Sequence, residues 1–188
     1  MAGVLYFRQS TAYAAGMFGK PRKMETEAQV YQAAIKILMR RGHSVHEMKK
    51  TLARRCEDEK IVKSVLDRLK RESLLDDARY AKQFTRVRTE SRKQGEFRIA
   101  RDLRARGVAD RHIEAATKEM AGTTDVATII RQRIERKLRL FHGEIDKKKL
   151  ASLYRSLLGA GFPSDLIRRE LHRVTRQQAS EVDPGPEQ

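Results

Sequence analysis

The sequence has no tryptophan, a single cysteine and few aromatic residues, which make up 6% of its 188 positions. A lone cysteine excludes an internal disulfide and is typical of a reducing compartment, so we expect a cytoplasmic protein. No stretch approaches the roughly 18 consecutive apolar residues that cross a bilayer. Runs of β-branched residues are nearly absent too, whereas Ala, Leu, Arg, Lys, Glu and Gln dominate. This composition predicts an all-α fold.

Two kinds of chemical site are also missing. The chain has no Gly-x-x-x-x-Gly-Lys-Ser/Thr phosphate loop, so we do not expect it to hydrolyse ATP. His43, His46 and Cys56 lack a fourth zinc ligand. Asp76 and Asp77 suit a capping role better than acid–base chemistry, because carboxylates at a helix N-terminus accept free backbone N–H groups. We therefore expect no metal, no cofactor and no enzymatic activity.

Positive charge is what the sequence has in excess. Lys and Arg number 41 against 25 Asp and Glu, which gives a formal net charge of +16. Such an imbalance favours polyanions, or proteins that coat a polyanion, as partners. A membrane surface is the other candidate, but no basic helix carries the broad Trp, Phe and Leu face that buries among lipid headgroups. We expect no membrane association.

Apolar residues recur at helical spacing along most of the chain. Tyr80, Phe84 and Val87 form one such stripe, and Ser44 and Glu47 form a capping box at the start of another segment. The pattern predicts helices from Glu27 to Arg41, Ser44 to about Arg55, Glu59 to Arg71, Asp76 to a break at Gly95, Gly95 to Gly107, Asp110 to Met120, Asp125 to about Phe141, Asp146 to about Leu158, and Pro163 to about Arg176.

The predicted helices fall into groups of three that repeat. When Leu52, Leu103 and Leu157 are aligned, apolar residues coincide at several further positions. The clearest aligned columns are Met48, Ile99 and Leu153; Val62, Ile113 and Ile167; Leu69, Met120 and Val174. We predict an elongated array of three tandem three-helix repeats at 27–73, 74–121 and 122–176, with a poorly ordered leader at 1–26 and a disordered tail at 177–188.

One turn departs from the repeat. Gly107 and Gly161 occupy the same position, four residues after the aligned leucines, and the equivalent residue of the first repeat is Cys56. Glycine suits a turn because it adopts backbone conformations that other residues avoid. The turn at Cys56 is therefore expected to be strained or differently shaped.

The middle repeat carries a recognisable motif. Residues 75–84 read Leu-Asp-Asp-Ala-Arg-Tyr-Ala-Lys-Gln-Phe, and residues 95–108 read Gly-Glu-Phe-Arg-Ile-Ala-Arg-Asp-Leu-Arg-Ala-Arg-Gly-Val. This phrase resembles the signature of the RecX family, bacterial regulators of the RecA recombinase, and the similarity covers roughly Glu27 to Arg176. The resemblance implies three tandem three-helix repeats, which agrees with the period found above. It also implies binding along the RecA–single-stranded DNA filament, which would block its growth and damp ATP hydrolysis, strand exchange and the SOS response.

Basic runs recur in all three repeats. Residues 36–55, 86–106 and 131–149 carry local net charges of +6, +5 and +5. One such run is usually a solvated helix face, but its recurrence along an array matches the repeating charge of a filament or nucleic-acid backbone. The predicted RecA or DNA contacts are Arg98, Arg101 and Arg104 in the middle repeat, Lys49, Lys50 and Arg54 in the first, and Lys147, Lys148, Arg168, Arg169 and Arg173 in the third.

The expected partners are the RecA filament and single-stranded DNA, with duplex DNA bound without sequence preference, and we expect a monomer. Tyr80 and Phe84 are expected in a core by their spacing, whereas Phe97 lies near a turn and is open to either role. Two other functions fit the same features. One is a DNA-binding regulator built from helix-turn-helix-like modules. The other is a general single-strand DNA-binding protein, which would act on RecA only by competing for DNA.

Overall fold

The computed structural model describes residues 23–140 and 146–182, and within them it contains nine α-helices and no strand. The predicted all-α fold is confirmed. The helices are α1 (Glu27–Arg40), α2 (Val45–Ala53), α3 (Glu59–Arg71), α4 (Asp77–Glu90), α5 (Glu96–Arg104), α6 (Asp110–Thr123), α7 (Val126–Leu138), α8 (Lys147–Gly159) and α9 (Ser164–Val182).

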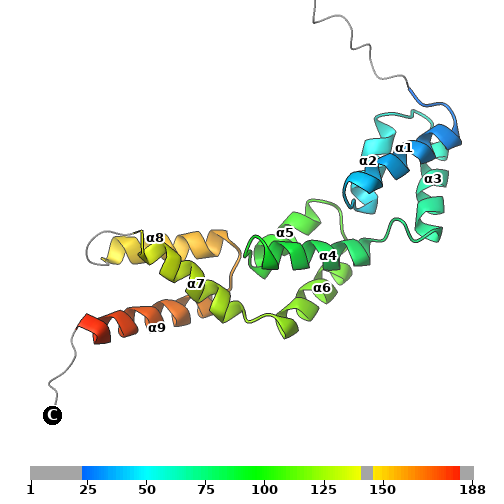
Figure 1. Cartoon of the computed structure of the whole chain (residues 1–188). Coiled ribbons are helices and arrows are strands. Elements are labelled where there is room, and N and C mark those ends of the chain that lie inside the picture. The colour runs from blue at the N-terminus through cyan, green and yellow to red at the C-terminus, as the bar shows by residue number, and fades with distance from the viewer. Residues whose placement is uncertain (1–22, 141–145, 183–188) are drawn as a thin grey trace, which may run out of the picture.

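The helices form three successive groups in an elongated molecule (Figure 1). Module 1 contains α1–α3, module 2 contains α4–α6 and module 3 contains α7–α9, and each group surrounds its own small hydrophobic core. The array of three-helix repeats predicted from the sequence is confirmed. The buried side chains at the centre of each core include Met48, Leu52 and Leu69 in module 1, Ile99, Leu103 and Ile113 in module 2, and Leu153, Leu157 and Ile167 in module 3.

The helix starts follow the local capping signals. Ser44 and Glu47 form the predicted capping box at the start of α2. Asp76 accepts hydrogen bonds from the backbone N–H groups of Ala78 and Arg79, so its predicted capping role is confirmed. Each such cap satisfies backbone donors that a helix N-terminus leaves without partners. Local chemistry therefore fixes where these helices begin.

The second helices of the modules meet end to end. The Ser44 hydroxyl, at the start of α2, donates to the carbonyl oxygen of Arg106, just beyond α5, at 2.6 Å. The backbone N–H of Gly95, at the start of α5, donates to the carbonyl oxygen of Ala160, just beyond α8, at 2.8 Å. When the modules are aligned on Leu52, Leu103 and Leu157, Ser44 is equivalent to Gly95 and Arg106 is equivalent to Ala160. The same junction is thus used twice, and it sets α8, α5 and α2 in one row.

Two glycines make this junction possible. Gly107 and Gly161 follow the accepting carbonyls and have φ angles of 72° and 89°, a region that favours glycine. A Cβ on Gly107 would lie 2.5 Å from the Cβ of His46, and one on Gly161 would lie 2.3 Å from the backbone nitrogen of Arg98. The glycines are therefore needed both for the turn and for the close approach of the next module.

The equivalent turn of module 1 receives a different segment. Its carbonyl oxygen, that of Arg55, accepts a hydrogen bond from the backbone N–H of Met24 at 2.7 Å, and Met24 also packs against the core of module 1. Cys56, in the glycine position, is buried and has no positive φ. The turn is thus differently shaped, as predicted, and it is not strained by a left-handed backbone conformation at Cys56.

Several boundaries differ from those predicted. Helix α9 continues to Val182, so the prediction of disorder from residue 177 is wrong for 177–182. Leu75, which the predicted boundaries assigned to the second repeat, is buried in the core of module 1. Residues 1–22, most of the predicted leader, lie outside the described residues, as do Phe141 and the end of the tail at 183–188. In the described ranges, no helix has both the length and the apolar character needed to cross a membrane.

Candidate nucleic-acid and protein interface

The row of second helices carries a repeating basic position. Lys50 on α2, Arg101 on α5 and Arg155 on α8 each stand two residues before the aligned leucines, and all three are exposed. Lys50 and Arg101 were predicted as contacts, but Arg155 was missed. The repeat register alone contained the signal for it, because Arg155 aligns with the other two. These three residues, here called the basic column, occupy equivalent places on the three modules.

The other predicted residues of the middle module have partners within the protein. Arg98 is partly buried at the junction between modules 2 and 3, where its Nη1 donates to the carbonyl oxygen of Gly159 at 3.2 Å. Arg104 is exposed and forms an ion pair with Asp110 at 2.7 Å. Arg98 therefore joins two modules, and its role as a RecA or DNA contact stays a prediction, as do those of Arg101 and Arg104.

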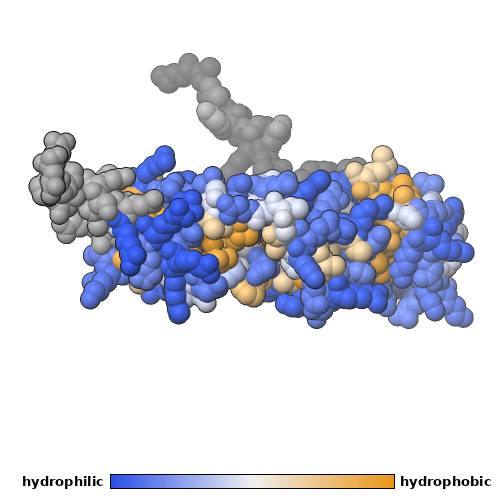
Figure 2. Space-filling model, turned by 90° about the horizontal axis from the view of Figure 1, so that it is seen from below, coloured by the Kyte–Doolittle hydropathy of each residue, from blue (hydrophilic) through white to orange (hydrophobic). Residues whose placement is uncertain are grey.

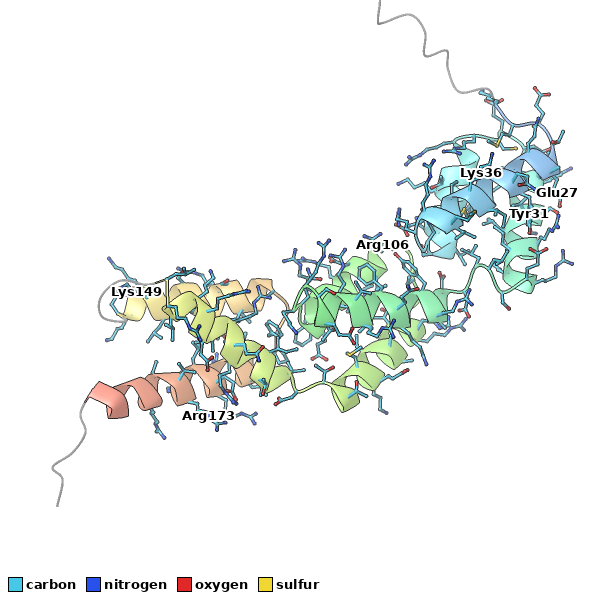
Figure 3. The ribbon with its side chains drawn as sticks, in the orientation of Figure 1. Glu27, Tyr31, Lys36, Arg106, Lys149 and Arg173 are labelled. Atoms are coloured by element: carbon cyan, nitrogen blue, oxygen red, sulfur yellow. The ribbon has the colours of Figure 1, made fainter. Side chains whose placement is uncertain are left out.

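The predicted residues of modules 1 and 3 are exposed, but they do not share one face. Lys49, Lys50 and Arg54 all lie on or next to α2. In module 3 the lysines Lys147 and Lys148 begin α8, whereas Arg168, Arg169 and Arg173 lie on α9. Figure 3 places Lys149, the next residue of α8, and Arg173 on opposite sides of module 3. Arg173 thus lies away from α8, whereas Arg168 turns toward it, with its guanidinium 5.9 Å from the centre of the Tyr154 ring.

A cluster of polar residues joins modules 1 and 2 around Glu47. Arg106 pairs with the Glu47 carboxylate at 2.5 Å, Arg41 at 3.5 Å, and the Tyr80 hydroxyl donates to it at 3.2 Å. Burial raises the pKa of Glu47, but the backbone N–H of Ser44 and the two arginines outweigh burial, so the pKa is lowered overall. Burial raises the pKa of Tyr80, and the neighbouring Glu47 charge adds to that shift.

Asp77 takes part in this junction rather than in capping its own helix. Its Oδ1 accepts a hydrogen bond from the backbone N–H of Val45, at the start of α2, at 2.8 Å. Asp76 therefore caps α4, its own helix, whereas Asp77 caps α2 of the preceding module. This arrangement places both side chains in structural roles.

The junction between modules 2 and 3 is rich in arginine. Arg133 Nη1 donates to the carbonyl oxygen of Lys93 at 2.5 Å, and its guanidinium lies 5.9 Å from the centre of the Phe162 ring. Burial lowers the pKa of Arg133, and the charges of Arg136 and Arg98 lower it further. Sequence patterns did not indicate Arg133, because its partner lies in another module.

Aromatic and metal-binding candidates have mainly structural places. Tyr80 and Phe84 pack at the edge of the module 2 core with ring centres 5.9 Å apart, so their predicted core role is confirmed, whereas Phe97 is 61% exposed. His43 is buried with its Nδ1 3.0 Å from the carbonyl oxygen of Arg41, and Cys56 lies in the module 1 core. Across the part of the chain that the structure describes, no three His, Cys, Asp or Glu residues are grouped to hold a metal ion.

Comparison with known proteins identifies the modules. A family model described as the first three-helix domain of RecX matches residues 31–69, and one described as the second three-helix domain of RecX matches residues 76–116. The regulatory protein RecX of Halorhodospira halophila is 38% identical over 140 residues, which cover 74% of this chain and 84% of that protein. The chain belongs to the RecX family. The resemblance found in residues 75–108 is thereby confirmed.

Other members of the family agree over most of their length. The RecX protein of Pseudomonas putida GB-1 is 33% identical over 150 residues, covering 79% of this chain and 92% of that protein. The crystal structure of RecX from Lactobacillus salivarius superposes with a TM-score of 0.69 at 21% identity, covering 79% of this chain and 96% of that one. This structural likeness supports the RecX fold of three-helix modules.

Proposed function

We propose that this RecX-family protein is a negative regulator of RecA that binds along the RecA–single-stranded DNA filament as a monomer in the cytoplasm. It would block filament growth and so reduce RecA's ATP hydrolysis, strand exchange and induction of the SOS response. Membership in a family of regulatory proteins supports the regulatory role. The motif at 75–108, which resembles that of RecA regulators, supports the choice of RecA as the target.

The observation that carries the filament mechanism is the basic column on a row of equivalent helices. Lys50, Arg101 and Arg155 present one exposed positive charge from each module, and the two junctions that set the row have the same hydrogen-bonded register. A filament is itself periodic, so several modules can bind neighbouring subunits or phosphates at once. Linked weak contacts of this kind give tight overall binding without any single strong site.

The hydrophilic character of the surface supports contacts with the filament that are made mainly by charged side chains. Most of the face seen in Figure 2 is hydrophilic, and smaller hydrophobic areas are scattered along its length. Charged contacts with phosphates or with acidic protein surface carry no base sequence information. A helix-turn-helix-like regulator would instead read base edges and would give a footprint on selected duplex sequences that random duplexes lack.

The test is RecA's DNA-dependent ATPase with this protein titrated in. Inhibition well below one molecule per RecA monomer is expected, because a molecule that stops filament growth affects many subunits. A general single-strand DNA-binding protein would instead lose its effect when DNA is in excess. Absence of inhibition at every ratio would contradict the proposed function.

A further inference from the structure

A basic groove lies where modules 1 and 2 meet, beside the junction between α2 and α5. It is formed by the turn between α1 and α2, by one face of α4 and by Arg106, and its volume is about 550 Å³. Figure 3 shows Arg106 at the end of module 2 that faces module 1. The lining residues, here called the module 1–2 groove, are Arg41, Gly42, Tyr80, Gln83, Phe84, Val87, Arg88, Arg92 and Arg106.

The groove has a large excess of positive charge. Its described lining contains four arginines and no carboxylate, and the nearest acidic partner, Glu47, pairs with only two of them, Arg106 and Arg41. Neither Arg88 nor Arg92 forms an ion pair with another described residue. Even with Glu47 counted, the four arginines leave three positive charges in excess. An anionic ligand would therefore be attracted more strongly here than on the ion-paired surface nearby.

Aromatic packing holds part of this charge in place. The guanidinium of Arg88 lies 4.8 Å from the centre of the Phe84 ring and that of Arg106 lies 5.1 Å from it. A guanidinium held over a ring keeps its N–H groups available at its edge, where they match the oxygens of a phosphate. Less side-chain entropy is then lost on binding than for a mobile lysine.

The groove also has an apolar wall. Val87 is 45% exposed on the face of α4 between Phe84 and Arg88. An occupant therefore has to combine negative charge with a flat or apolar surface. Single-stranded nucleic acid does so, because unstacked bases present their faces beside the phosphates. A duplex keeps its base faces stacked and so cannot offer them to Val87. An acidic peptide would pair with the arginines but would place no flat apolar group against Val87.

We propose that the module 1–2 groove binds single-stranded DNA, with Arg88 and Arg92 contacting phosphates and Val87 contacting a base. The inference rests on the proposed function for the nature of the polyanion, but it concerns DNA contact that does not require RecA. The two basic surfaces would then have different roles. The module 1–2 groove would bind the DNA strand, and the basic column would contact the rest of the filament.

The experiment measures binding of the full-length protein to fluorescent oligo(dT) by anisotropy, without RecA, over a series of salt concentrations. Each phosphate contact on a single strand contributes about 0.7 to the slope of log K against log salt. The double variant Arg88→Gln/Arg92→Gln should therefore lose about 1.4 of that slope and bind about 25-fold more weakly at roughly 0.1 M salt. The matched control, Lys63→Gln/Lys118→Gln, removes two exposed charges elsewhere and should retain the wild-type slope.

A second variant tests the wall separately. Val87→Ser should weaken binding of oligo(dT) but leave binding of an abasic oligonucleotide of the same length unchanged. Circular dichroism checks that each variant is folded. Unchanged affinity and slope for Arg88→Gln/Arg92→Gln would overturn the proposal. So would a double variant that binds DNA normally but no longer inhibits RecA's ATPase, because the groove would then be a protein contact.

The outcome for the groove can be separated from the outcome for the proposed function. If wild-type protein fails to inhibit RecA but the double variant loses DNA binding, the regulatory proposal fails and the DNA site stands. If wild-type protein inhibits RecA and the double variant retains its DNA affinity, the regulatory proposal stands and the DNA site fails.

Discussion

The hydroxyl of Ser44 donates to the carbonyl oxygen of Arg106 across 62 residues of sequence, at 2.6 Å. One module further along, Gly95 and Ala160 make the equivalent contact through a backbone N–H at 2.8 Å. The two donors differ chemically, yet they occupy the same register and meet the same carbonyl position. The array is thus kept regular by the same geometry at both junctions, although the donor groups differ, and the proposed binding to a filament depends on that regularity.

The first prediction concerns the glycines at these junctions. Gly161→Ala should destabilise the protein by about 2–4 kcal/mol, because the added Cβ meets the backbone nitrogen of Arg98 and the residue must keep a positive φ. Gly107→Ala should also be destabilising, because its added Cβ meets the Cβ of His46, which side-chain rotation does not move, and the residue must keep a positive φ. Urea unfolding followed by circular dichroism measures both.

Gly122→Ala provides the control for the glycine series. Gly122 lies in α6, and a Cβ there would have no heavy atom within 4 Å. Alanine should therefore stabilise that variant by up to about 1 kcal/mol, through its better helix propensity. Equal effects of alanine at positions 161 and 122 would show that the module 2–3 junction is not closely packed.

The second prediction is a pH dependence that comes from Glu47. The Ser44 backbone N–H and the Arg106 and Arg41 charges hold its folded-state pKa below the ordinary value for a glutamate carboxyl. A lowered carboxyl pKa contributes stability that is present above the unfolded-state pKa, about 4.3, and is lost as the pH falls through the folded value. Glu47→Gln should thus destabilise the protein at pH 7 by about 1–3 kcal/mol. The difference from wild type should shrink as the pH falls below about 4.5.

The measurement is the unfolding free energy of wild type and variant between about pH 3 and 7, because titration of the other carboxylates cancels in the difference. Glu114→Gln, at an exposed position on α6, is the control and should show only a small difference from wild type. A constant penalty for Glu47→Gln across the series would mean that shape, rather than charge, explains its role at the junction.

The sequence predicted the helices and their grouping because both depend on local information. Apolar periodicity and the caps at Ser44 and Asp76 act within a few residues, and the register of Leu52, Leu103 and Leu157 reports the repeat. The junctions could not be predicted in the same way. Their contacts join residues far apart in sequence and depend on how whole modules approach.

Arg98 and the end of α9 depend on more than their local sequence. Arg98 was predicted as a RecA or DNA contact, and its place at the start of α5 also brings it against the end of α8. The chain after Arg176 was expected to be disordered because it has little to bury. Helix α9 nevertheless continues to Val182, since extending a formed helix is much less costly than starting one.

The third prediction tests the basic column. Lys50→Glu, Arg101→Glu and Arg155→Glu together should raise the concentration needed for half-inhibition of RecA's ATPase on the order of 10–100-fold. Each exposed charge contact contributes about 0.2–1 kcal/mol, and reversal of charge adds repulsion. The melting temperature should hardly change, because all three side chains are exposed.

The matched control for the basic column carries the same change in net charge. It is the triple variant Lys63→Glu/Lys118→Glu/Lys137→Glu, with one exposed lysine per module on helices other than α2, α5 and α8. If it impairs inhibition equally, net charge rather than the position of the column determines binding. If neither triple variant affects inhibition, the filament contacts lie on another face.

The last prediction concerns a buried ion pair within module 3. Arg131 on α7 pairs with Glu170 on α9 at 3.0 Å, and the Glu170 side chain is only 6% exposed. Arg131→Met would leave that carboxylate buried without its partner, which should cost on the order of 3 kcal/mol. Arg131→Met/Glu170→Leu should recover most of the loss, because two apolar side chains need no compensating charge.

The control is Arg169→Ala, which breaks an exposed ion pair with Asp165 and should cost at most about 0.5 kcal/mol. Hydrogen exchange resolved over α7 and α9 would locate the effect, and a double variant no more stable than Arg131→Met would show that Arg131 acts by packing rather than by charge.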